Sequence, residues 1–465
     1  MCPVRRDVLA ACFAAVSLYG AYAALGGDCS DPQGACPTPC PAEKSCNSPY
    51  GSAEGCPEGL ICVPSCLPSW CFCDLEHNSW ACSADCAGEC YDWPEPTGPP
   101  TYTITPLGTL GGVEGIAFGI NNYGDIVGEA GALDGKRHAA LWTDGQVIDN
   151  GPYGGTYALE INNLQQVIIN DSTGTRAYLW QDRECVQLPG LNPADSAYAE
   201  GINDAGHIVG RTYVYALREH HSCMWQDGIV TDLTEAIGMS VHAVNNLGHY
   251  AGAVGPNFSY HAAVWDGMTV TDLGTLGGQV SGAGRINDLG QVIGQSERAP
   301  GGDRMFYGFF WDGQRMHDVS EFAGYSVRDL ELNNCAEVVF RGTGRSDEAL
   351  YVYHAGRGLR PVRGVYGPAT GWWNLDVRDM NDRGEIVGMG QLPNGLGRAF
   401  VIKPIPGDLD WDGDVDLRDL SELSLRFSGP KAPAIPGCER ADIDRDADVD
   451  LDDLAGFQSA LSGPL

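Results

Sequence analysis

A ten-residue pattern that returns along most of the chain limits what this sequence can fold into. It runs from Gly119 to Gly128, and a clear copy runs from Gly201 to Gly210. Further copies span 243–252, 285–294 and 379–388, and two weaker copies span 160–169 and 331–340. Seven asparagines anchor the copies at spacings of 41, 41, 42, 42, 46 and 48 residues: Asn121, Asn162, Asn203, Asn245, Asn287, Asn333 and Asn381. A repeat of about 40 to 45 residues has the length of one four-stranded propeller blade.

Each repeat contains two hairpin signals, which together predict four strands. The first is an Asn-x-x-Gly turn such as Asn287 to Gly290, which lacks its glycine at Gln165 and Ala336. The second is Asp-Gly after an aromatic residue, as in Trp265-Asp266-Gly267. Both favour tight hairpins. The strands predicted in the first repeat are 115–120, 125–130, 138–142 and 146–149.

The two ends of the repeat region complement each other. The last repeat ends at Phe400 to Ile402 without a fourth strand, whereas Thr103 to Gly112 resembles a fourth strand found inside the array, Thr269 to Gly278. We therefore predict a mainly β fold in which the N-terminal strand completes the seventh blade of a closed propeller over 101–405. An open β-solenoid, the alternative fold, does not explain the displaced strand.

The N-terminus has the pattern of an export signal. Arg5 and Arg6 precede an apolar run over 8–25, and Ala21-Tyr22-Ala23 is typical of a cleavage site. The prediction is a signal peptide over 1–23 and a secreted or cell-surface protein with no stable membrane insertion after cleavage. A retained membrane anchor is the alternative.

Twelve cysteines lie between Cys29 and Cys90. In an exported segment of this size, over 24–91, they predict a disulfide framework, because so short a segment buries too little apolar area alone. Zinc is the competing interpretation for Cys82, Cys86 and Cys90, but paired CxxC motifs are missing. A proline-rich linker, 92–100, follows.

Charge excludes some classes of partner. The net charge is −33, and only four of the 28 basic residues are lysines. Such a surface repels phosphate backbones and anionic lipids, so no nucleic-acid partner is expected.

The repeats resemble the HAF extracellular repeat family in three segments: His138 to Trp142, His261 to Trp265 and Arg398 to Phe400. That resemblance covers 101–405 and implies secretion more firmly than any activity. Equivalent positions in the repeats carry polar or aromatic side chains: His138, Arg176, His221, His261, Tyr307 and Arg398. We expect each to bond a turn in its own blade, the alternative being a ring that binds a ligand or metal.

The C-terminal region, 406–465, contains two acidic loops with the ligand spacing of a calcium loop. Carboxylates occupy positions 1, 3, 5, 7, 9 and 12, where position 7 contributes its backbone carbonyl. The predicted metal residues are Asp408, Asp410, Asp412, Asp414, Asp416 and Asp419 in the first loop, and Asp442, Asp444, Asp446, Asp448, Asp450 and Asp453 in the second. Two Ca²⁺ ions are therefore expected. An acidic disordered tail, the alternative, would not repeat this register.

Each loop leads into a short amphipathic stretch, 420–427 or 454–461, predicted to be helical. This duplicated loop and helix resembles a type I dockerin. The resemblance implies a cohesin-like protein partner recognised by loop positions 10 and 11. These are Leu417-Arg418 and Leu451-Asp452 here, in place of the polar pairs common in cellulosomal dockerins.

Two functions fit these observations. The first is a secreted, non-catalytic binding or scaffold protein whose propeller presents an interaction surface for a carbohydrate or cell-surface ligand and whose dockerin-like module docks to a partner. The alternative is a secreted carbohydrate-active enzyme, a polysaccharide hydrolase or lyase, with its site in the propeller. No catalytic residues are identified from the sequence, and glycoside hydrolysis requires an acid/base pair.

Overall fold

The computed structural model describes most of the chain from residue 100 onward and four short strands before it. The described residues are 60–64, 71–74, 79–82, 88–92, 100–256, 259–298, 306–320, 326–343, 349–354, 358–366, 370–410, 413–429, 439–445 and 448–461. The chain divides into two compact units, Met1–Thr97 and Gly98–Leu465. The predicted signal peptide and most of the predicted linker lie outside the described residues.

The first unit contains two small antiparallel sheets. Strands β1 (Leu60–Pro64) and β4 (Gly88–Asp92) form one, and β2 (Cys71–Asp74) and β3 (Ser79–Cys82) form the other. Their backbone registers place Cys62 opposite Cys90 and Cys71 opposite Cys82. The disulfide framework itself stays a prediction.

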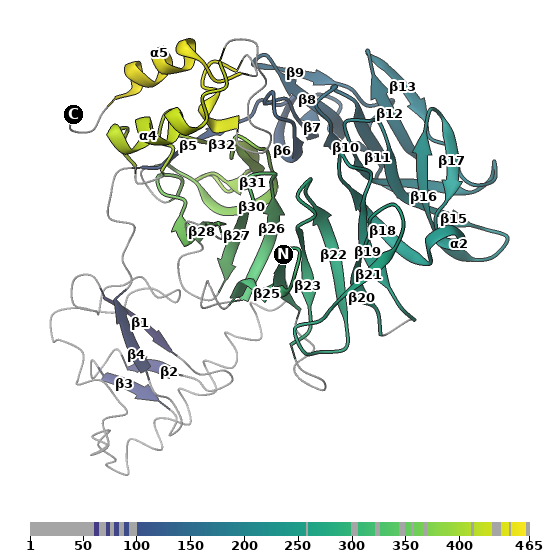
Figure 1. Ribbon diagram of the computed structural model, residues 1–465, viewed down its shortest axis with the longest axis horizontal. Coiled ribbons are helices and arrows are strands. Elements are labelled where there is room, and N and C mark those ends of the chain that lie inside the picture. The colour runs from purple at the N-terminus through teal and green to yellow at the C-terminus, as the bar shows by residue number, and fades with distance from the viewer. Residues whose placement is uncertain are drawn as a thin grey trace. The chain divides into compact units, whose positions relative to one another are not determined.

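The second unit contains seven four-stranded antiparallel sheets, as the repeats predict. The first three are β6 (Gly111–Ile120), β7 (Ile126–Ala132), β8 (Arg137–Thr143), β9 (Gln146–Asp149); β10 (Thr156–Ile161), β11 (Val167–Asp171), β12 (Ala177–Gln181), β13 (Glu184–Gln187); and β14 (Ser196–Ile202), β15 (Ile208–Val214), β16 (Glu219–Gln226), β17 (Ile229–Asp232). The next two are β18 (Met239–Val244), β19 (Tyr250–Val254), β20 (His261–Trp265), β21 (Val270–Gly274); and β22 (Ser281–Ile286), β23 (Val292–Ser296), β24 (Tyr307–Trp311), β25 (Met316–Asp318). The last two are β26 (Ser326–Leu332), β27 (Glu337–Thr343), β28 (Ala349–His354), β29 (Gly358–Pro361); and β30 (Trp373–Met380), β31 (Ile386–Gln391), β32 (Gly397–Pro404), β5 (Tyr102–Pro106). We number these sheets blades 1 to 7, and Figure 1 labels most of their strands.

The predicted closure of the propeller is confirmed. Strand β5 is the outer strand of blade 7, where Tyr102 pairs with Pro404 and Pro106 pairs with Phe400. Tyr102 is buried in a hydrophobic cluster with residues of blades 6 and 7, including Val339 and Phe400. The first strand of the domain therefore belongs to its last blade.

Every blade has a β-bulge in its inner strand, just before the anchoring asparagine. The bulge brings the inner carbonyl groups close to the second strand, where most repeats have glycine. A Cβ on Gly252, for example, would lie 1.9 Å from the carbonyl oxygen of Ser240. In blade 6, where Phe340 stands at this position, the bulge is one residue longer and extends from Arg328 to Glu331. The close approach favours the glycine found in five repeats, although blade 2 accommodates Ile169 at this position beside a bulge of the ordinary length.

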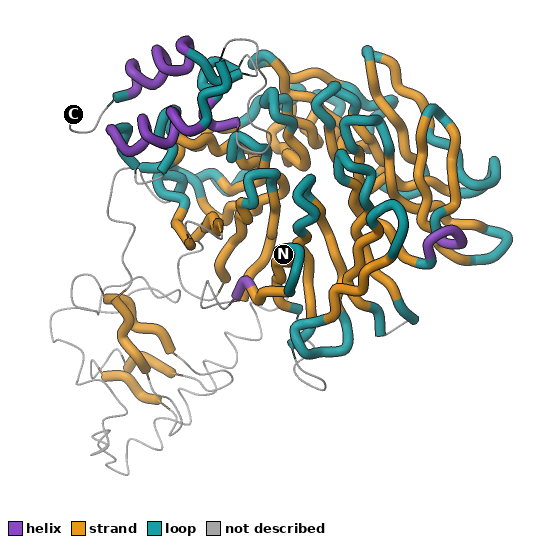
Figure 2. Tube along the Cα trace, in the orientation of Figure 1, coloured by secondary structure: helices purple, strands orange, loops and turns teal. Residues whose placement is uncertain are grey.

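The C-terminal module follows β32 directly and contains the helices α4 (Leu417–Leu425) and α5 (Leu451–Ala460), with a 3₁₀ turn η2 (Glu439–Ala441). A further short helix, α2 (Thr234–Ile237), follows β17 in blade 3. Figure 2 shows α4 and α5 beside a body built of strands. The core of the module is small and apolar: Leu409, Val415, Leu423, Ala441, Val449 and Phe457.

Candidate metal centre and propeller channel

The first acidic loop folds around the side chain at its last ligand position. Asp419, which is fully buried, accepts hydrogen bonds through Oδ1 from the backbone N–H groups of Leu409 and Asp410, at 2.6 and 2.9 Å. Its Oδ2 accepts from the N–H of Asp416 at 2.9 Å, and Asp416 caps helix α4. The residue at position 12 thus holds both ends of the loop and the start of the helix.

The second loop repeats this arrangement. Asp453 accepts from the backbone N–H groups of Ile443 and Asp444 through Oδ1 and from Asp450 through Oδ2, at 2.5, 3.2 and 2.7 Å. Asp450 caps helix α5 with the same capping box. Both helices therefore begin where the sequence places the end of a calcium loop.

The described carboxylates of each loop lie close enough to share an ion. In each of four sets, one oxygen per residue lies within 4.8 Å of the others: Asp408, Asp410 and Asp419; Asp414, Asp416 and Asp419; Asp442, Asp444 and Asp453; and Asp448, Asp450 and Asp453. The predicted ligands Asp412 and Asp446 lie outside the described residues. The structure thus brings together ten of the twelve predicted residues in two clusters, each sharing one aspartate.

The chemistry of these clusters fits Ca²⁺. All their donors are carboxylate oxygens, the hard ligands that Ca²⁺ prefers. The segment 407–463 carries 15 acidic and 5 basic residues, so its formal charge is 5 − 15 = −10. A divalent cation would offset the mutual repulsion of these groups.

At one end of the propeller, the seven asparagines form a closed ring of hydrogen bonds. The side-chain amide of each donates to the backbone carbonyl of the next, from Asn121 through to Asn381, which donates back to Asn121, at 2.9 to 3.2 Å. The Oδ1 atom of each accepts two N–H groups of its own turn, as Asn245 accepts from Leu247 and His249. Each anchoring asparagine thus closes its own turn and joins that turn to the next blade.

The following residues form a second closed ring. Each backbone N–H donates to the side-chain oxygen of its equivalent in the next blade, at 2.7 to 3.0 Å. The members are Asn122, Asn163, Asp204, Asn246, Asp288, Asn334 and Asp382. This explains why the repeats have asparagine or aspartate at this position, since only these side chains place an acceptor there.

Four charged side chains occupy the position two residues before the anchoring asparagine. They are Glu160, Arg285, Glu331 and Asp379, and we call them the channel quartet. The Nε atom of Arg285 lies 3.1 Å from Glu331. Glu160 accepts from the backbone N–H of Ile202 and Asp379 from that of Ile120, at 3.0 and 2.8 Å.

Burial raises the pKa of Glu331 to about 8 and that of Glu160 to about 7. The attraction of Arg285 opposes this effect in both cases but is the smaller of the two influences. Burial also raises the pKa of Asp379. Glu331 and Glu160 therefore hold protons near neutral pH, which ordinary surface carboxylates do not.

The channel quartet stands between two cavities. Glu160 and Asp379 line a small one of about 150 Å³ formed with the asparagine rings. Arg285 and Glu331 line a larger one of about 1220 Å³, which we call the funnel. It is bordered mainly by inner strands of blades 3 to 7, and its volume is somewhat larger than the roughly 300 to 1,000 Å³ of typical small-molecule sites.

Charged and aromatic groups line the funnel wall. His242 Nδ1 lies 2.7 Å from Glu200, which also pairs with Arg211. Arg211 in turn lies over the ring of Tyr198, 4.5 Å from its centre. Polar groups of this kind, held by one another, can orient a polar ligand.

Three of the histidines bond within their own blades, as predicted, but their Nδ1 partner is an aspartate of the fourth strand and not a turn. The Nδ1 atoms of His138, His221 and His261 lie 2.7, 2.6 and 2.9 Å from Asp149, Asp232 and Asp272. In blade 5, Arg298 pairs with Asp318 and lies 3.8 Å from the centre of the Tyr307 ring. These contacts tie the third and fourth strands together.

Sequence reasoning missed the channel quartet, because its members share no local motif. Their common feature is the position relative to the anchoring asparagine, which is occupied by glycine or alanine in the other repeats, at Gly119, Gly201 and Ala243. Aligning the repeats on the asparagine and comparing charge at each position would have found the quartet.

The propeller is similar in fold to solved structures of low sequence identity. The β-propeller domain of the Trilobed protease from Pyrococcus furiosus is 10% identical, the match covering 63% of this chain and 94% of that chain with a TM-score of 0.40. YCF48 from Cyanidioschyzon merolae is 12% identical over 65% of this chain and 98% of that chain, with a TM-score of 0.39. A sialidase from Trypanosoma rangeli, in complex with the inhibitor DANA, is 9% identical over 73% and 65%, with a TM-score of 0.31. Similarities at these sequence identities and TM-scores do not indicate a function.

No model of a known protein family matches the chain, and no curated protein matches it. Among the described residues, no helix is long and apolar enough to cross a membrane.

Proposed function

We propose that this chain is a secreted binding protein whose C-terminal module holds two Ca²⁺ ions and attaches to another protein, while its propeller presents a ligand surface. One observation carries the proposal. The acidic clusters occur twice, each around a buried aspartate, Asp419 or Asp453, at the same place in the loop. Duplication of the spacing in sequence is thus matched by duplication of the cluster in space.

The calcium part of the proposal assigns the first ion to Asp408, Asp410, Asp412, Asp414, Asp416 and Asp419, and the second to the matching residues from Asp442 to Asp453. Calorimetric titration of the full chain with Ca²⁺ tests it, with an expected stoichiometry of two. Asp408→Ala should abolish one site and Asp442→Ala the other. A wild-type stoichiometry of zero would contradict the assignment.

The attachment part rests on two exposed leucines. Leu417 and Leu451, at position 10 of the loops, have exposed fractions of 55% and 69% and lie outside the core of the module. Exposed apolar groups at duplicated positions suit a protein interface, and the resemblance to dockerins suggests a cohesin-like partner. A Ca²⁺-dependent pull-down from the secretome, repeated with Leu417→Ser and Leu451→Ser, tests this. Leu425→Ser, at a leucine of the same module that is 72% exposed but outside both loops, is the matched control.

For the propeller we propose the funnel as the ligand site, for a carbohydrate or other polar cell-surface ligand. The mixed charges of Glu200, Arg211 and His242 and the rings of Tyr260 and Phe306 support it. Binding to a polysaccharide panel should weaken in Tyr260→Ala. Tyr123→Ala, at an exposed tyrosine of the opposite channel end, is the control.

A second candidate function is a carbohydrate-active enzyme, and the channel quartet is the observation that favours it. Glu331 lines the funnel, and a carboxyl with a pKa of about 8 can act as a general acid at neutral pH. Screening the chain for hydrolase and lyase activity tests this. Activity lost in Glu331→Gln would support the enzyme, and binding without turnover would favour the non-catalytic protein.

Secretion and the disulfide framework over 24–91 complete the proposal. The thiols of Cys185 and Cys223 lie in separate blades, and burial raises the pKa of both to about 11. Reduction is therefore expected to leave the propeller folded. Mass mapping of the secreted chain tests the framework, and a majority of free thiols in Cys29 to Cys90 would contradict it.

A further inference from the structure

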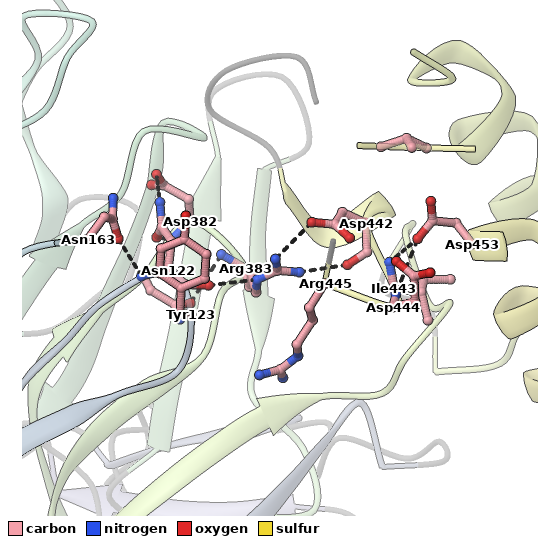
Figure 3. Close-up of polar contacts among 12 residues, drawn as sticks. Asn122, Tyr123, Asn163, Asp382, Arg383, Asp442, Ile443, Asp444, Arg445 and Asp453 are labelled. Carbon is pink, nitrogen blue, oxygen red and sulfur yellow. Dashed lines mark hydrogen bonds and ion pairs between the residues drawn. The ribbon is translucent and has the colours of Figure 1, made fainter. Parts of the chain in front are cut away.

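The propeller reaches into the second acidic loop through one arginine. Arg383 belongs to the turn between β30 and β31, directly after the two ring residues of blade 7. Its Nη1 donates to the backbone carbonyl of Asp442 at 2.6 Å and its Nη2 to Oδ2 of Asp442 at 2.8 Å. Its Nε donates to the carbonyl of Asn122 at 2.8 Å, as Figure 3 shows. One guanidinium thus joins blades 7 and 1 to the first ligand position of the loop.

This contact is buried. The side chains of Arg383 and Asp442 have exposed fractions of 7% and 0%. A charge pair removed from water in this way has to be well satisfied, because an unpaired partner would cost several kcal/mol. The bidentate geometry, with one bond to the carboxylate and one to the carbonyl, fixes both the side chain and the backbone of Asp442.

Two further ion pairs surround it. Arg440 lies 3.1 Å from Glu337 with both side chains buried, and Arg445 lies 2.7 Å from Glu385. The Arg440 guanidinium packs so closely on Gly384 that a Cβ there would lie 1.8 Å from Nη2. The propeller surface is therefore shaped to the segment that begins the second loop.

The first loop has a different arrangement at the same position. Oδ2 of Asp408 accepts from the backbone N–H of Gly413 at 3.1 Å, inside its own loop. Gly413 is position 6, the glycine that calcium loops require for their sharp turn. In the second loop this position is Ala447, and Arg383 donates to Oδ2 of the first ligand position, Asp442.

We propose that Arg383 is a metal-positioning residue of the second loop: the propeller holds the backbone carbonyl and one carboxylate oxygen of Asp442, the first predicted Ca²⁺ ligand, in place. Calcium binding at this loop and docking of the module on the propeller then strengthen each other. The inference rests on the proposed calcium sites. It adds that a residue of the propeller takes part in the second site.

The charges allow this arrangement. A carboxylate has two oxygens, so Asp442 can accept from Arg383 and still offer a ligand. The described part of the loop contributes five carboxylates, at Asp442, Asp444, Asp448, Asp450 and Asp453. One guanidinium leaves the cluster strongly negative, so attraction for Ca²⁺ persists. Because Asp442 is already held, metal binding does not have to order it.

The coupling is reciprocal. If docking raises the affinity of the loop for Ca²⁺, Ca²⁺ must stabilise docking by the same factor. Removal of Arg383 should therefore weaken the metal site, and removal of the metal should loosen the contact with the propeller.

Titration of the full chain in an Asp408→Ala background, where only the second site remains, tests the proposal. Adding Arg383→Met should lower the affinity for Ca²⁺ at least tenfold, and Arg383→Lys should lower it less. Arg137→Met is the control, since Arg137 belongs to blade 1, pairs with Glu114 and Glu129, and lines neither the funnel nor the acidic loops. The same Arg383→Met change in an Asp442→Ala background should leave the first site unaltered.

Hydrogen exchange of residues 439–445 supplies a second readout. Calcium should slow exchange there in the wild type and much less in Arg383→Met. Unchanged or tighter Ca²⁺ binding in the arginine variants would overturn the proposal, with Arg383→Lys deciding if Arg383→Met fails to fold. A wild type that binds two ions with no effect of Arg383 refutes this inference alone, whereas a wild type that binds none refutes the calcium sites as well.

Discussion

The propeller and the C-terminal module both wrap backbone N–H groups around a side-chain oxygen, but the two oxygens differ in charge. In the propeller the acceptor is a neutral amide, such as that of Asn245, which also donates to the next blade. In the module it is the carboxylate of Asp419 or Asp453, surrounded by other carboxylates. The neutral rings satisfy themselves within the chain, whereas the acidic loops accumulate repulsion that a cation relieves. Repetition of a turn therefore stabilises one part, whereas in the other, on the proposed calcium sites, it creates a dependence on metal.

The largest effect is expected from removing the strand that closes the propeller. Deleting residues 101–112 removes β5 and the buried Tyr102, exposing the edge of β32. We expect a loss comparable with the stability of a whole domain, roughly 5 to 15 kcal/mol. Thermal melting of this variant is compared with that of a chain lacking only residues 1–97. If both melt alike, closure does not hold the ring together.

The second-largest effect is expected when the C-terminal module loses the buried carboxylate of Asp419. Asp419→Ala leaves three backbone N–H groups without their buried acceptor. The module should lose about 3 kcal/mol, since hydrogen bonds to charged groups are among the strongest. Its helical signal and its response to a calcium chelator are the measurements, and Asp452→Ala, at an exposed neighbour of the second loop, is the control. If neither Asp419→Ala nor the chelator alters the helical signal, the module does not depend on its carboxylates and does not differ from the propeller in this respect.

A comparable side-chain truncation in the propeller tests how a neutral acceptor differs from a charged one. Asn245→Ala removes one donor and the acceptor of two N–H groups, and we expect a loss of about 2 kcal/mol that does not change with ionic strength. The loss in Asp419→Ala should depend on salt, because charges are screened. Denaturant unfolding at low and high salt measures both. Leu247→Ala, on the exposed face of the same turn, is the control.

The channel quartet predicts a smaller, pH-dependent effect within the propeller. The folded-state pKa of Glu331 is about 8, above its ordinary value of 4.5. Its contribution to stability is therefore fully present below about pH 4.5 and is lost as the pH rises through 8. Unfolding free energy measured from pH 5 to 9 should fall less steeply in Glu331→Gln. Identical pH profiles for the two proteins would show that burial does not perturb this carboxyl.

The smallest effect concerns a turn whose glycine is missing. Ala336 has φ 59°, where Gly290 of the neighbouring blade has φ 73°. Ala336→Gly should relieve left-handed strain at some cost in unfolded-state entropy, a net gain of about 0.5 kcal/mol. The reverse change, Gly290→Ala, should lose about 1 kcal/mol by the same reasoning. Equal stabilities for both variants and the wild type would mean that the asparagine alone sets these turns.

The repeats made the fold predictable because each carries its own turn chemistry. Asn121 and its six equivalents fix one hairpin per blade, and the missing last strand implied the closure by β5. Even Gln165 and Ala336 adopt the left-handed backbone, since their asparagines hold the turns. Such local signals can be recognised in the sequence without knowledge of the tertiary structure.

Contacts between distant segments were not predictable in this way. The calcium spacing is local, so ten of its residues were predicted and are found together. Arg383, by contrast, looks like any turn residue, and only the packing of the module on blade 7 reveals its partner Asp442. The positions of the channel quartet could have been found by aligning the repeats, but the contact between Arg285 and Glu331 could not, because these residues lie in neighbouring blades.

The pairing of β5 with β32 has a mechanical consequence. The chain enters β5 at Tyr102 and leaves β32 at Pro404, and these two residues face each other at one end of the pair. The backbone N–H of Ile405 donates to the carbonyl of Thr101 just beyond them. If the two termini were tethered to separate bodies, tension would enter both strands at the same end and open their hydrogen bonds one after another. The strand pair that closes the ring is thus loaded in the unzipping direction, where resistance to force is low.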